Sequence, residues 1–366
     1  MKTLRSIIEY HATNTPNAIA FIDVNETITY AELANRARQF AAGLHLLGIR
    51  KGDVVAVQLP NIIEYLIAYF AITWYGGIMT TIYMQYDKKE IETILTDSNA
   101  KAFICLSDNT IQVIVLGNTP NVILFNDLAS TDPLNSNPYT PIGSDLFLLL
   151  YTSGTTSKPK GVLASYDMRL ENSRLNADEH KITSNDRLIL ASSFSHMWSI
   201  YSINLGIIIG CSFAIFPKFA PLELVKTIAS LKPTIFFGAP AHIAMCFEKG
   251  VFNDIKNISL TSVIVSGSSI NPNLARKLID QFPSIKFSQL WGMTETQVGL
   301  FTRPNDSIKI SSQTVGKPAP DTKFRIVNDE LQTKSPFVFS GYLNNEDLNN
   351  EIFTEDGWFK TGDFAT

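Results

Sequence analysis

Short apolar runs and longer stretches with apolar residues at every third or fourth position alternate along most of the chain. The short runs predict strands, and the longer stretches predict amphipathic helices. Strands are expected at 18–24, 54–59, 78–83, 102–106, 122–125, 146–150, 187–191, 211–216, 234–238, 262–266 and 285–290. Helices are expected at 4–12, 30–47, 62–75, 88–97, 198–210, 221–231, from 241 onward, and at 272–282. This alternation predicts an α/β fold with parallel-rich sheets flanked by helices in two lobes.

The pattern changes after about residue 302, where short strands follow one another without long helices. Strands are expected at 323–327 and 337–339, with turns around them. A small β-barrel-like lobe is therefore expected over about 302–366. The segment 126–144 is rich in Asn and Pro and predicts a surface loop.

The composition is that of an ordinary globular protein with a large core. The 366 residues are 45% hydrophobic and 17% charged, and a formal net charge of −4 gives no basic face for nucleic acid. Cys105, Cys211 and Cys246 lie among apolar neighbours without metal-like spacing, which predicts buried free thiols. The first residues lack a signal-peptide pattern, and the apolar runs 65–83 and 201–216 are interpreted as core segments. A cytoplasmic location is therefore expected.

The densest run of hydroxyl and glycine residues follows the predicted strand 146–150. Every residue from Thr152 to Thr156 is of this kind, and Lys158 and Lys160 come next. Closely spaced backbone N–H groups, hydroxyl donors and cations suit a polyphosphate. The residue order differs from a Walker A loop, in which Gly-Lys-Ser/Thr closes the segment. The alternative interpretation is a solvated turn between two core elements.

This loop resembles the signature loop of the acyl-adenylate-forming (AMP-binding) superfamily, which includes acyl- and aryl-CoA synthetases and the adenylation domains of peptide synthetases. The resemblance covers nearly the whole chain, from Thr29 to Asp363. It implies that the loop holds the triphosphate of ATP. The residues implied in this role are Thr152, Ser153, Gly154, Thr155, Thr156 and Lys160.

The segment 289–295, Gln-Leu-Trp-Gly-Met-Thr-Glu, resembles a second family motif: an aromatic residue, a glycine, any residue, then Thr-Glu. The resemblance implies that Trp291, where the family usually has Tyr, stacks on adenine. It also implies that Thr294 contacts the α-phosphate and that Glu295 binds Mg²⁺, both as catalytic residues; a carboxylate suits this hard cation. A strand-to-helix corner with a solvated Glu295 is the alternative. The nucleotide-binding residues implied here are Gln289, Leu290, Trp291, Gly292, Met293 and Thr294.

Two further stretches resemble nucleotide-binding segments of the same family. The Thr-Gly-Asp at 361–363 implies that Asp363 accepts hydrogen bonds from both ribose hydroxyls. Ser266, Gly267 and Ser268 resemble the glycine-rich stretch beside adenine and the acyl tunnel. Taken without the resemblance, the first is a common turn and the second is weak.

The segment 194–198, Phe-Ser-His-Met-Trp, resembles the one that gates the acid in acyl- and aryl-CoA synthetases, so His196 is expected to position the carboxylate. A core histidine is the alternative. No acidic residue lies between Leu190 and Pro221, where amino-acid-selecting domains usually have an Asp for the substrate ammonium. An unpaired ammonium there would be costly, so the acid is expected to lack an amino group. The expected pocket residues are His196, Met197, Trp198, Tyr201, Gly238, Ala239 and Pro240, with His242 and Met245 as further candidates.

The resemblance implies a ligase that makes acyl-AMP from a carboxylic acid and ATP and then forms a thioester with CoA. Its expected cofactors and partners are ATP, Mg²⁺, CoA and a fatty, cyclic or aryl acid, with no nucleic acid and no integral membrane segment. A carrier-protein phosphopantetheine as acceptor stays open. Family members continue into a small mobile domain with an essential lysine, whereas this sequence stops at Thr366. Residues 1–366 are therefore expected to be the large N-terminal adenylation domain with little activity alone, or a non-catalytic nucleotide-binding protein if the gene ends there.

Overall fold

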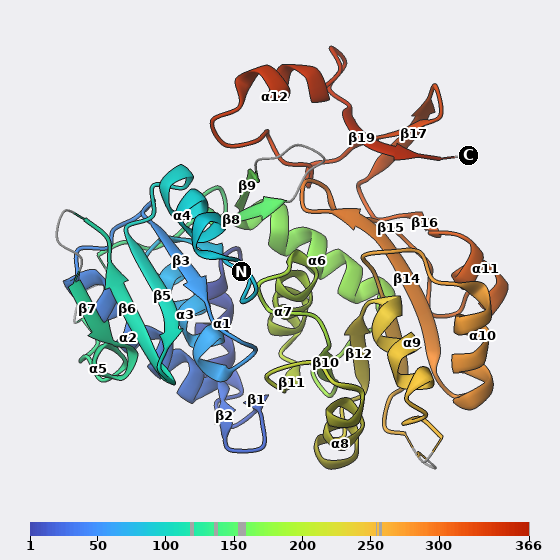
Figure 1. The fold of residues 1–366 in the computed structure, drawn as a ribbon, viewed down its shortest axis with the longest axis horizontal. Coiled ribbons are helices and arrows are strands. Elements are labelled where there is room, and N and C mark those ends of the chain that lie inside the picture. The colour runs from blue at the N-terminus through green and yellow to red at the C-terminus, as the bar shows by residue number, and fades with distance from the viewer. Residues whose placement is uncertain (118–120, 135–137, 153–158, 254, 256–257, 366) are drawn as a thin grey trace. The chain divides into compact units, whose positions relative to one another are not determined.

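The computed structural model describes residues 1–117, 121–134, 138–152, 159–253, 255 and 258–365, and Figure 1 shows the course of the chain. Its internal contacts divide the chain into two compact units. The first unit consists of Met1–Phe21, Glu26–Asp167 and Ser193–Met197. The second unit consists of Ile22–Asn25, Met168–Ser192 and Trp198–Thr366.

The first unit is built on a sheet with parallel central strands and antiparallel edges. Its strands follow one another in the order β7 (Asn121–Leu124), β6 (Thr110–Val115), β5 (Ala102–Ser107), β3 (Val54–Gln58), β4 (Ile78–Thr81), β8 (Leu146–Thr152) and β9 (Lys160–Ser165). Strands β5, β3, β4 and β8 pair in parallel, whereas β6, β7 and β9 pair antiparallel. The strands β1 (Ile19–Ile22) and β2 (Thr27–Thr29) come before them in the chain.

The helices of the first unit form where the sequence supplies caps and apolar faces. They are α1 (Leu4–Asn14), α2 (Tyr30–Leu46), α3 (Ile63–Trp74), α4 (Lys88–Asp97) and α5 (Phe125–Ala129). A capping box starts α2, with the Thr29 hydroxyl and the Glu32 carboxylate each accepting a backbone N–H. Helix α3 is buried at every residue except Glu64 and packs against α2, as Figure 1 shows. The strand–helix–strand unit β3–α3–β4 is parallel, as predicted.

The second unit has a larger sheet and a small separate one. In the larger sheet, strands follow in the order β16 (Lys317–Pro318), β15 (Gln297–Phe301), β14 (Lys286–Met293), β13 (Ser262–Val265), β12 (Ile235–Gly238), β10 (Arg187–Leu190) and β11 (Ser212–Ala214). Strands β14 to β11 in this order pair in parallel, and β15 and β16 pair antiparallel. The small sheet is antiparallel and consists of β17 (Lys323–Val327), β18 (Glu330–Lys334) and β19 (Phe359–Phe364).

Most helices of the second unit connect parallel strands of the larger sheet. They are α6 (Tyr166–His180), α7 (Met197–Ile209), α8 (Pro221–Leu231), α9 (Pro240–Glu248), α10 (Pro272–Gln281), α11 (Ile308–Gln313) and α12 (Glu346–Ile352), with the first two residues of α6 and the first of α7 assigned to the first unit. Prolines open α8, α9 and α10, where a missing N–H costs nothing. Figure 1 shows α10 and α11 side by side along β14.

The structure confirms the α/β class, and it corrects several predicted elements. Strands β6 and β9 and helices α5 and α6 form where no element was expected. The stretch 337–339 is not a strand, because Phe337 and Phe339 are buried as single apolar anchors in a turn region. The terminal lobe contains a three-stranded sheet rather than a barrel among its described residues. Strand β14 continues to Met293, so the aromatic motif lies inside a strand that turns back into β15 instead of at a strand-to-helix corner.

Two further predictions concern the cysteines and the membrane-spanning segments. Cys105, Cys211 and Cys246 are buried free thiols, as predicted. Among the helices described, none combines the length and the apolar character that crossing a bilayer requires.

Candidate functional site

Two predicted nucleotide-binding side chains that are 72 residues apart in the sequence meet in the second unit. The indole Nε1–H of Trp291 on β14 donates a hydrogen bond to Oδ2 of Asp363 on β19, at 2.8 Å. Trp291 is half-buried and Asp363 is exposed. The contact therefore joins the larger sheet to the small one and leaves an aromatic face and a carboxylate accessible together.

Glycines and one aromatic ring shape the surroundings of the Trp291 indole. Phe324 meets the indole edge to face, with ring centroids 5.6 Å apart. A Cβ added at Gly299 would lie 3.0 Å from Cζ3 of Trp291 and 2.8 Å from Cζ of Phe324. The absence of a side chain at Gly299 therefore leaves room for the two rings. A Cβ at Gly292 would lie 1.9 Å from the carbonyl oxygen of Gln297, so only glycine fits where β14 and β15 cross closely.

An open pocket of about 720 Å³ lies against this pair of side chains. Its lining includes Trp291, Asp363 and Phe324, together with Val315 and Gly316 from the segment before β16. A volume of this size is within the range of small-molecule sites, which combine apolar walls with a few polar groups. Its volume and its mixed lining are compatible with a small organic ligand.

Glu295 is a buried carboxylate at the turn between β14 and β15. It is 4% exposed, and its Oε1 accepts a hydrogen bond from the phenol of Tyr342 at 2.7 Å. Its backbone carbonyl accepts the N–H of Phe339 at 2.8 Å. Burial and the adjacent Glu295 charge raise the pKa of Tyr342 well above its usual range, so the phenol stays protonated and donates. The carboxylate is thus held in one orientation by a neutral donor that does not cancel its charge.

A second buried side chain fixes the residue before this carboxylate. Arg169 on α6 is 2% exposed, and its Nη2 donates to the carbonyl oxygen of Thr294 at 2.7 Å. Within the turn, the Met293 N–H donates to the Thr296 hydroxyl at 3.1 Å. The backbone of the Thr294–Glu295 motif is therefore anchored from α6 and from its own turn.

Other predicted nucleotide residues form the supporting wall of this region. Ser266 is buried, and its hydroxyl donates to the carbonyl of Leu290 at 3.1 Å, which ties the end of β13 to β14. Gly267 has a φ of +90°, a conformation that favours glycine, and Ser268 is exposed. The Gln289 amide is buried and donates to the carbonyl of Thr314, at 2.5 Å. Gln289 and Ser266 thus position neighbouring backbone.

The predicted acid-binding residues of the second unit cluster around the end of β12. The indole N–H of Trp198 donates to the carbonyl of Gly238 at 3.1 Å, and its ring stacks on Tyr201 with centroids 5.4 Å apart. Both aromatic residues are buried. His242 accepts the Ala239 N–H on its Nδ1 at 3.0 Å, so it caps the start of α9, where Pro240 is the first residue. Met245 on the same helix is exposed.

The first unit carries His196 and Met197. The backbone before them is anchored, because Asn61 Oδ1 accepts the Phe194 N–H at 2.7 Å and the Tyr65 phenol donates to the Phe194 carbonyl at 3.0 Å. His196 is an exposed residue, yet neighbouring protein atoms desolvate its imidazole and lower its pKa. A neutral imidazole at physiological pH follows.

The first unit also carries the ends of the predicted phosphate loop. Thr152, the last residue of β8, pairs antiparallel with Lys160, the first of β9. The two strands therefore bring a hydroxyl and an ammonium group to the same end of a hairpin. The predicted phosphate ligands Ser153, Gly154, Thr155 and Thr156 lie outside the described residues.

The surroundings of Glu295 bear on the predicted Mg²⁺ site. Across the described ranges, no group of three or more His, Cys, Asp or Glu side chains that could hold a metal ion is present. Mg²⁺ in nucleotide sites takes one or two protein carboxylates and completes its coordination with phosphates and water. A single oriented carboxylate fits an ion that arrives with ATP, and does not fit a resident protein-only metal site.

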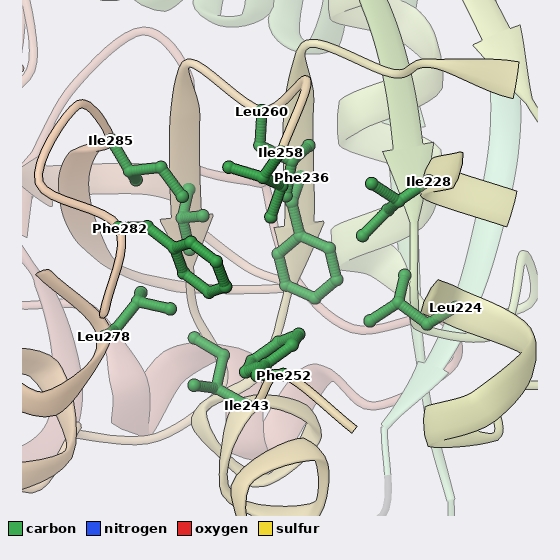
Figure 2. A pocket seen from close by; sticks show the side chains of 11 residues that line it. Leu224, Ile228, Phe236, Ile243, Phe252, Ile258, Leu260, Leu278, Phe282 and Ile285 are labelled. Carbon is green, nitrogen blue, oxygen red and sulfur yellow. The ribbon is translucent and has the colours of Figure 1, made fainter. Parts of the chain in front are cut away.

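A second pocket of this unit differs from the site just described. It is about 10 Å³ and is lined only by apolar side chains, which come from α8, α9, α10, two strands of the larger sheet and the connecting segments between them. Figure 2 shows the rings of Phe236, Phe252 and Phe282 turned toward one another across it. It lacks any polar group that would orient a ligand, so it is a packing void of the core.

Three residues that contribute to the site were not predicted as such. Tyr342 lies outside the motifs singled out in the sequence, and its spacing from Glu295 along the chain gave no signal of contact. Arg169 lies on α6, where polar and apolar residues share the buried face and hydrophobic periodicity therefore fails. Phe324 lies on a strand that was predicted, but its contact with Trp291 depends on how the two sheets pack together.

Comparison with known proteins gives one family. The profile of a family described as AMP-binding enzyme matches residues 8–343. The 4-coumarate-CoA ligase 1 of Narcissus pseudonarcissus is 27% identical over 376 residues, covering 93% of this chain and 68% of that protein. Tyrocidine synthase 1 of Brevibacillus parabrevis is 26% identical over 391 residues, covering 100% of this chain and 35% of that protein.

Solved structures confirm the fold. The inhibitor-bound crystal structure of the N-terminal domain of FACL13 from Mycobacterium tuberculosis superposes with a TM-score of 0.88 at 21% identity. The superposition covers 99% of this chain and 96% of that one.

Proposed function

Because the chain belongs to the AMP-binding enzyme family, we propose that it activates a carboxylic acid with ATP and passes the acyl group to the thiol of CoA. In the first step, a carboxylate oxygen attacks the α-phosphorus, the bond to the bridging β-phosphate oxygen breaks, and pyrophosphate leaves. In the second step, the thiol sulfur attacks the acyl carbon, the bond to the AMP oxygen breaks, AMP leaves and the thiol proton goes to water. Alignment and charge neutralisation dominate such phosphoryl chemistry.

The observation that carries this proposal is the 2.8 Å contact between Trp291 and Asp363 beside an open pocket. A flat aromatic face suits adenine, and a carboxylate suits the two hydroxyls of ribose. The two side chains come from different sheets, and neither of them belongs to the buried core. Their meeting is best explained by a nucleoside that uses both.

The reacting phosphates would be held by residues that differ in role. Thr294 would contact the α-phosphate, and Glu295 would hold Mg²⁺, which neutralises phosphate charge when it is bound. The remaining phosphate ligands are proposed to be Thr152, Ser153, Gly154, Thr155, Thr156 and Lys160. The orientation of Glu295 by Tyr342 supports a carboxylate kept ready for a cation.

The acid is proposed to be a fatty, cyclic or aryl acid without an amino group. The residues from Trp198 to Ile207 on α7 are buried, and none of them is charged, so this helix offers no partner for an ammonium group. His196 would contact the acid carboxylate. Gly238, Ala239, Pro240, Trp198, Tyr201 and Met197 would surround the acyl part. A cytoplasmic location, a role in fatty acid metabolism and the assignment as a large N-terminal domain stay predictions from the sequence.

Stable analogues of the intermediate test the proposal without requiring turnover. Acyl-sulfamoyl-adenosines with fatty, cyclic and aryl acyl groups would be titrated into the chain by calorimetry, with ATP and sulfamoyl-adenosine as references. One acyl class is expected to bind at least about 100-fold more tightly than ATP, because it occupies both the nucleotide and the acid pocket. Failure of both ATP and every analogue to bind at millimolar concentration would contradict the proposal. Acid-dependent ATP–pyrophosphate exchange with the same acids would then identify the substrate.

A carrier-protein phosphopantetheine is the second candidate acceptor. It is supported by the similarity of the whole chain to part of tyrocidine synthase 1. Transfer of a radiolabelled acyl group from its adenylate to free CoA or to a panel of phosphopantetheinylated carrier proteins separates the two candidates.

A further inference from the structure

The hydrogen bond between Trp291 and Asp363 gives the carboxylate a partner before any nucleotide is present. Among the described residues, the Trp291 indole donates the hydrogen bond that this carboxylate accepts. The Asp363 backbone is fixed separately, because its N–H donates to the Thr361 hydroxyl at 3.1 Å. The neighbouring Gly362 N–H donates to Glu330 Oε1 at 3.1 Å. The backbone of Asp363 is therefore held by β19 and β18, while the rotamer of its side chain depends on Trp291.

The indole is itself held by contacts that do not involve Asp363. Phe324 packs against it in an edge-to-face contact, and the absence of a side chain at Gly299 leaves space for the indole ring. The direction of the indole N–H is consequently set by packing on β14, β15 and β17. A donor of fixed direction selects one position of an exposed carboxylate that would otherwise sample several rotamers.

We propose that Trp291 is a positioning residue for Asp363 and through it a determinant of ribose recognition, in addition to its role as an adenine-stacking surface. The indole N–H occupies one lone pair of Oδ2, and the other acceptor sites of the carboxylate remain directed at the two ribose hydroxyls. A phenylalanine would keep an aromatic face and lose this restraint. This inference rests on the proposed function, because it assumes that a nucleoside occupies the pocket.

The test compares two nucleotides that differ only in the ribose hydroxyls. ATP and 2′,3′-dideoxy-ATP would be titrated by calorimetry into the wild type, Trp291→Phe, Asp363→Ala and the double variant. Trp291→Phe is expected to lose about 5- to 10-fold in affinity for ATP, the scale of one hydrogen bond to a charged group. Its affinity for dideoxy-ATP should stay within about 2-fold of the wild type, because stacking is retained. In the Asp363→Ala background, Trp291→Phe should cause no further loss for ATP.

Two controls keep the result interpretable. Trp358→Phe makes the same chemical change at a tryptophan that stacks on Arg325, with the guanidinium carbon 4.5 Å from the ring, and it should leave both affinities unchanged. Replacement of Trp291 by benzothienylalanine exchanges the N–H for sulfur and keeps the ring size. That variant should show the same loss of affinity for ATP and not for dideoxy-ATP, and it replaces Trp291→Phe in the test if Trp291→Phe does not fold.

The outcomes separate this inference from the function on which it rests. Equal losses for ATP and dideoxy-ATP, or no loss for either, would overturn the positioning role and leave nucleotide binding intact. A wild type that binds both nucleotides equally would overturn ribose recognition by Asp363. A wild type that binds neither nucleotide would overturn the proposed function together with the inference.

Discussion

Two pockets among the described residues of the second unit differ in size, lining and access. The open pocket of about 720 Å³ has an indole and a carboxylate on its wall, and these are polar groups that no core element requires there. The pocket of Figure 2 is about 10 Å³ and is surrounded by aliphatic side chains and phenylalanines. The open pocket has the features of a binding site, whereas the apolar pocket is a small packing void of the core.

The difference between the pockets lies in what each side chain does without a ligand. In the open pocket, Trp291 and Asp363 are hydrogen-bonded to each other, and both side chains keep accessible surface that a ligand can contact. In the apolar pocket, no group could orient a water or a polar ligand, and such voids stay dry. Changes at the open pocket are therefore expected to alter binding with little effect on stability, and changes at the apolar pocket the reverse.

The largest expected effect is on stability, from Phe282→Ala. Phe282 is 5% exposed and meets Phe252 edge to face, with centroids 5.5 Å apart. Truncation enlarges an existing void and should cost about 3–5 kcal/mol of unfolding free energy, measured by urea denaturation. ATP affinity of the folded variant should remain within about 2-fold of wild type, whereas Phe282→Leu should cost less stability. Full stability in Phe282→Ala would show that the apolar pocket is not part of a packed core.

A binding effect of intermediate size is expected from Glu295→Gln. The amide oxygen can still accept from Tyr342, so the fold is retained while the charge is lost. The gain in ATP affinity on adding Mg²⁺, compared with excess EDTA, should fall by about 10- to 100-fold, or 1.4–2.7 kcal/mol. Tyr342→Phe is the matched comparison, because it keeps the charge of Glu295 and removes only the donor that orients it; its Mg²⁺ gain should fall by less than that of Glu295→Gln. An unchanged Mg²⁺ gain in Glu295→Gln would remove this residue from the site.

A pH effect is expected from a residue that belongs to neither pocket. Burial, with a contribution from the Arg303 charge, lowers the pKa of His180 to about 3, and its ring lies 5.0 Å from that of Phe301. The unfolded state therefore takes up a proton below about pH 6.5, whereas the folded state does not. The stability that His180 contributes is present above pH 6.5 and falls by about 1.4 kcal/mol per unit as the pH drops toward 3.

His180→Leu isolates this contribution. The difference in unfolding free energy between wild type and variant should shift in favour of the variant as the pH is lowered from 7 to 4.5. Carboxylates that titrate in the same range are common to both proteins and cancel in the difference. Parallel pH profiles for the two proteins would contradict the buried, neutral state of His180.

The smallest expected effect is a gain in stability from filling the apolar pocket. Val263 on β13 lines it, and Val263→Ile adds one methylene group toward the void. A gain of about 0.5 kcal/mol is expected, with no change in ATP affinity. A loss of more than about 1 kcal/mol would indicate that the void is too small for a methylene group and that the core is already full.

Much of the fold was predictable because local signals agreed with the tertiary structure. The box of Thr29 and Glu32 starts α2, and the helix predicted at 88–97 has the bounds of α4. Helix α6 was missed because polar residues take up much of its buried face. It buries Arg169, Asn172, Ser173, Asn176 and His180 beside apolar residues such as Tyr166 and Leu170, which obscures the hydrophobic periodicity.

The site was predictable as a set of residue types and not as a set of contacts. The motifs identified Trp291, Glu295 and Asp363 one by one. Nothing in the sequence indicated that an indole would bond to a carboxylate on another sheet, or that Tyr342 would orient Glu295. These contacts depend on how the small sheet and the segment around Tyr342 pack against the end of β14 and its turn into β15.

The most direct test of the nucleotide site is a calorimetric titration of MgATP into the wild type and Asp363→Ala, with thermal unfolding of both. We expect saturable 1:1 binding to the wild type, about 10- to 100-fold weaker binding to the variant because hydrogen bonds to a charged group are lost, and equal unfolding temperatures because Asp363 is exposed. Equal affinity of both proteins for MgATP, or no binding to the wild type at millimolar ATP, would contradict this account of the site.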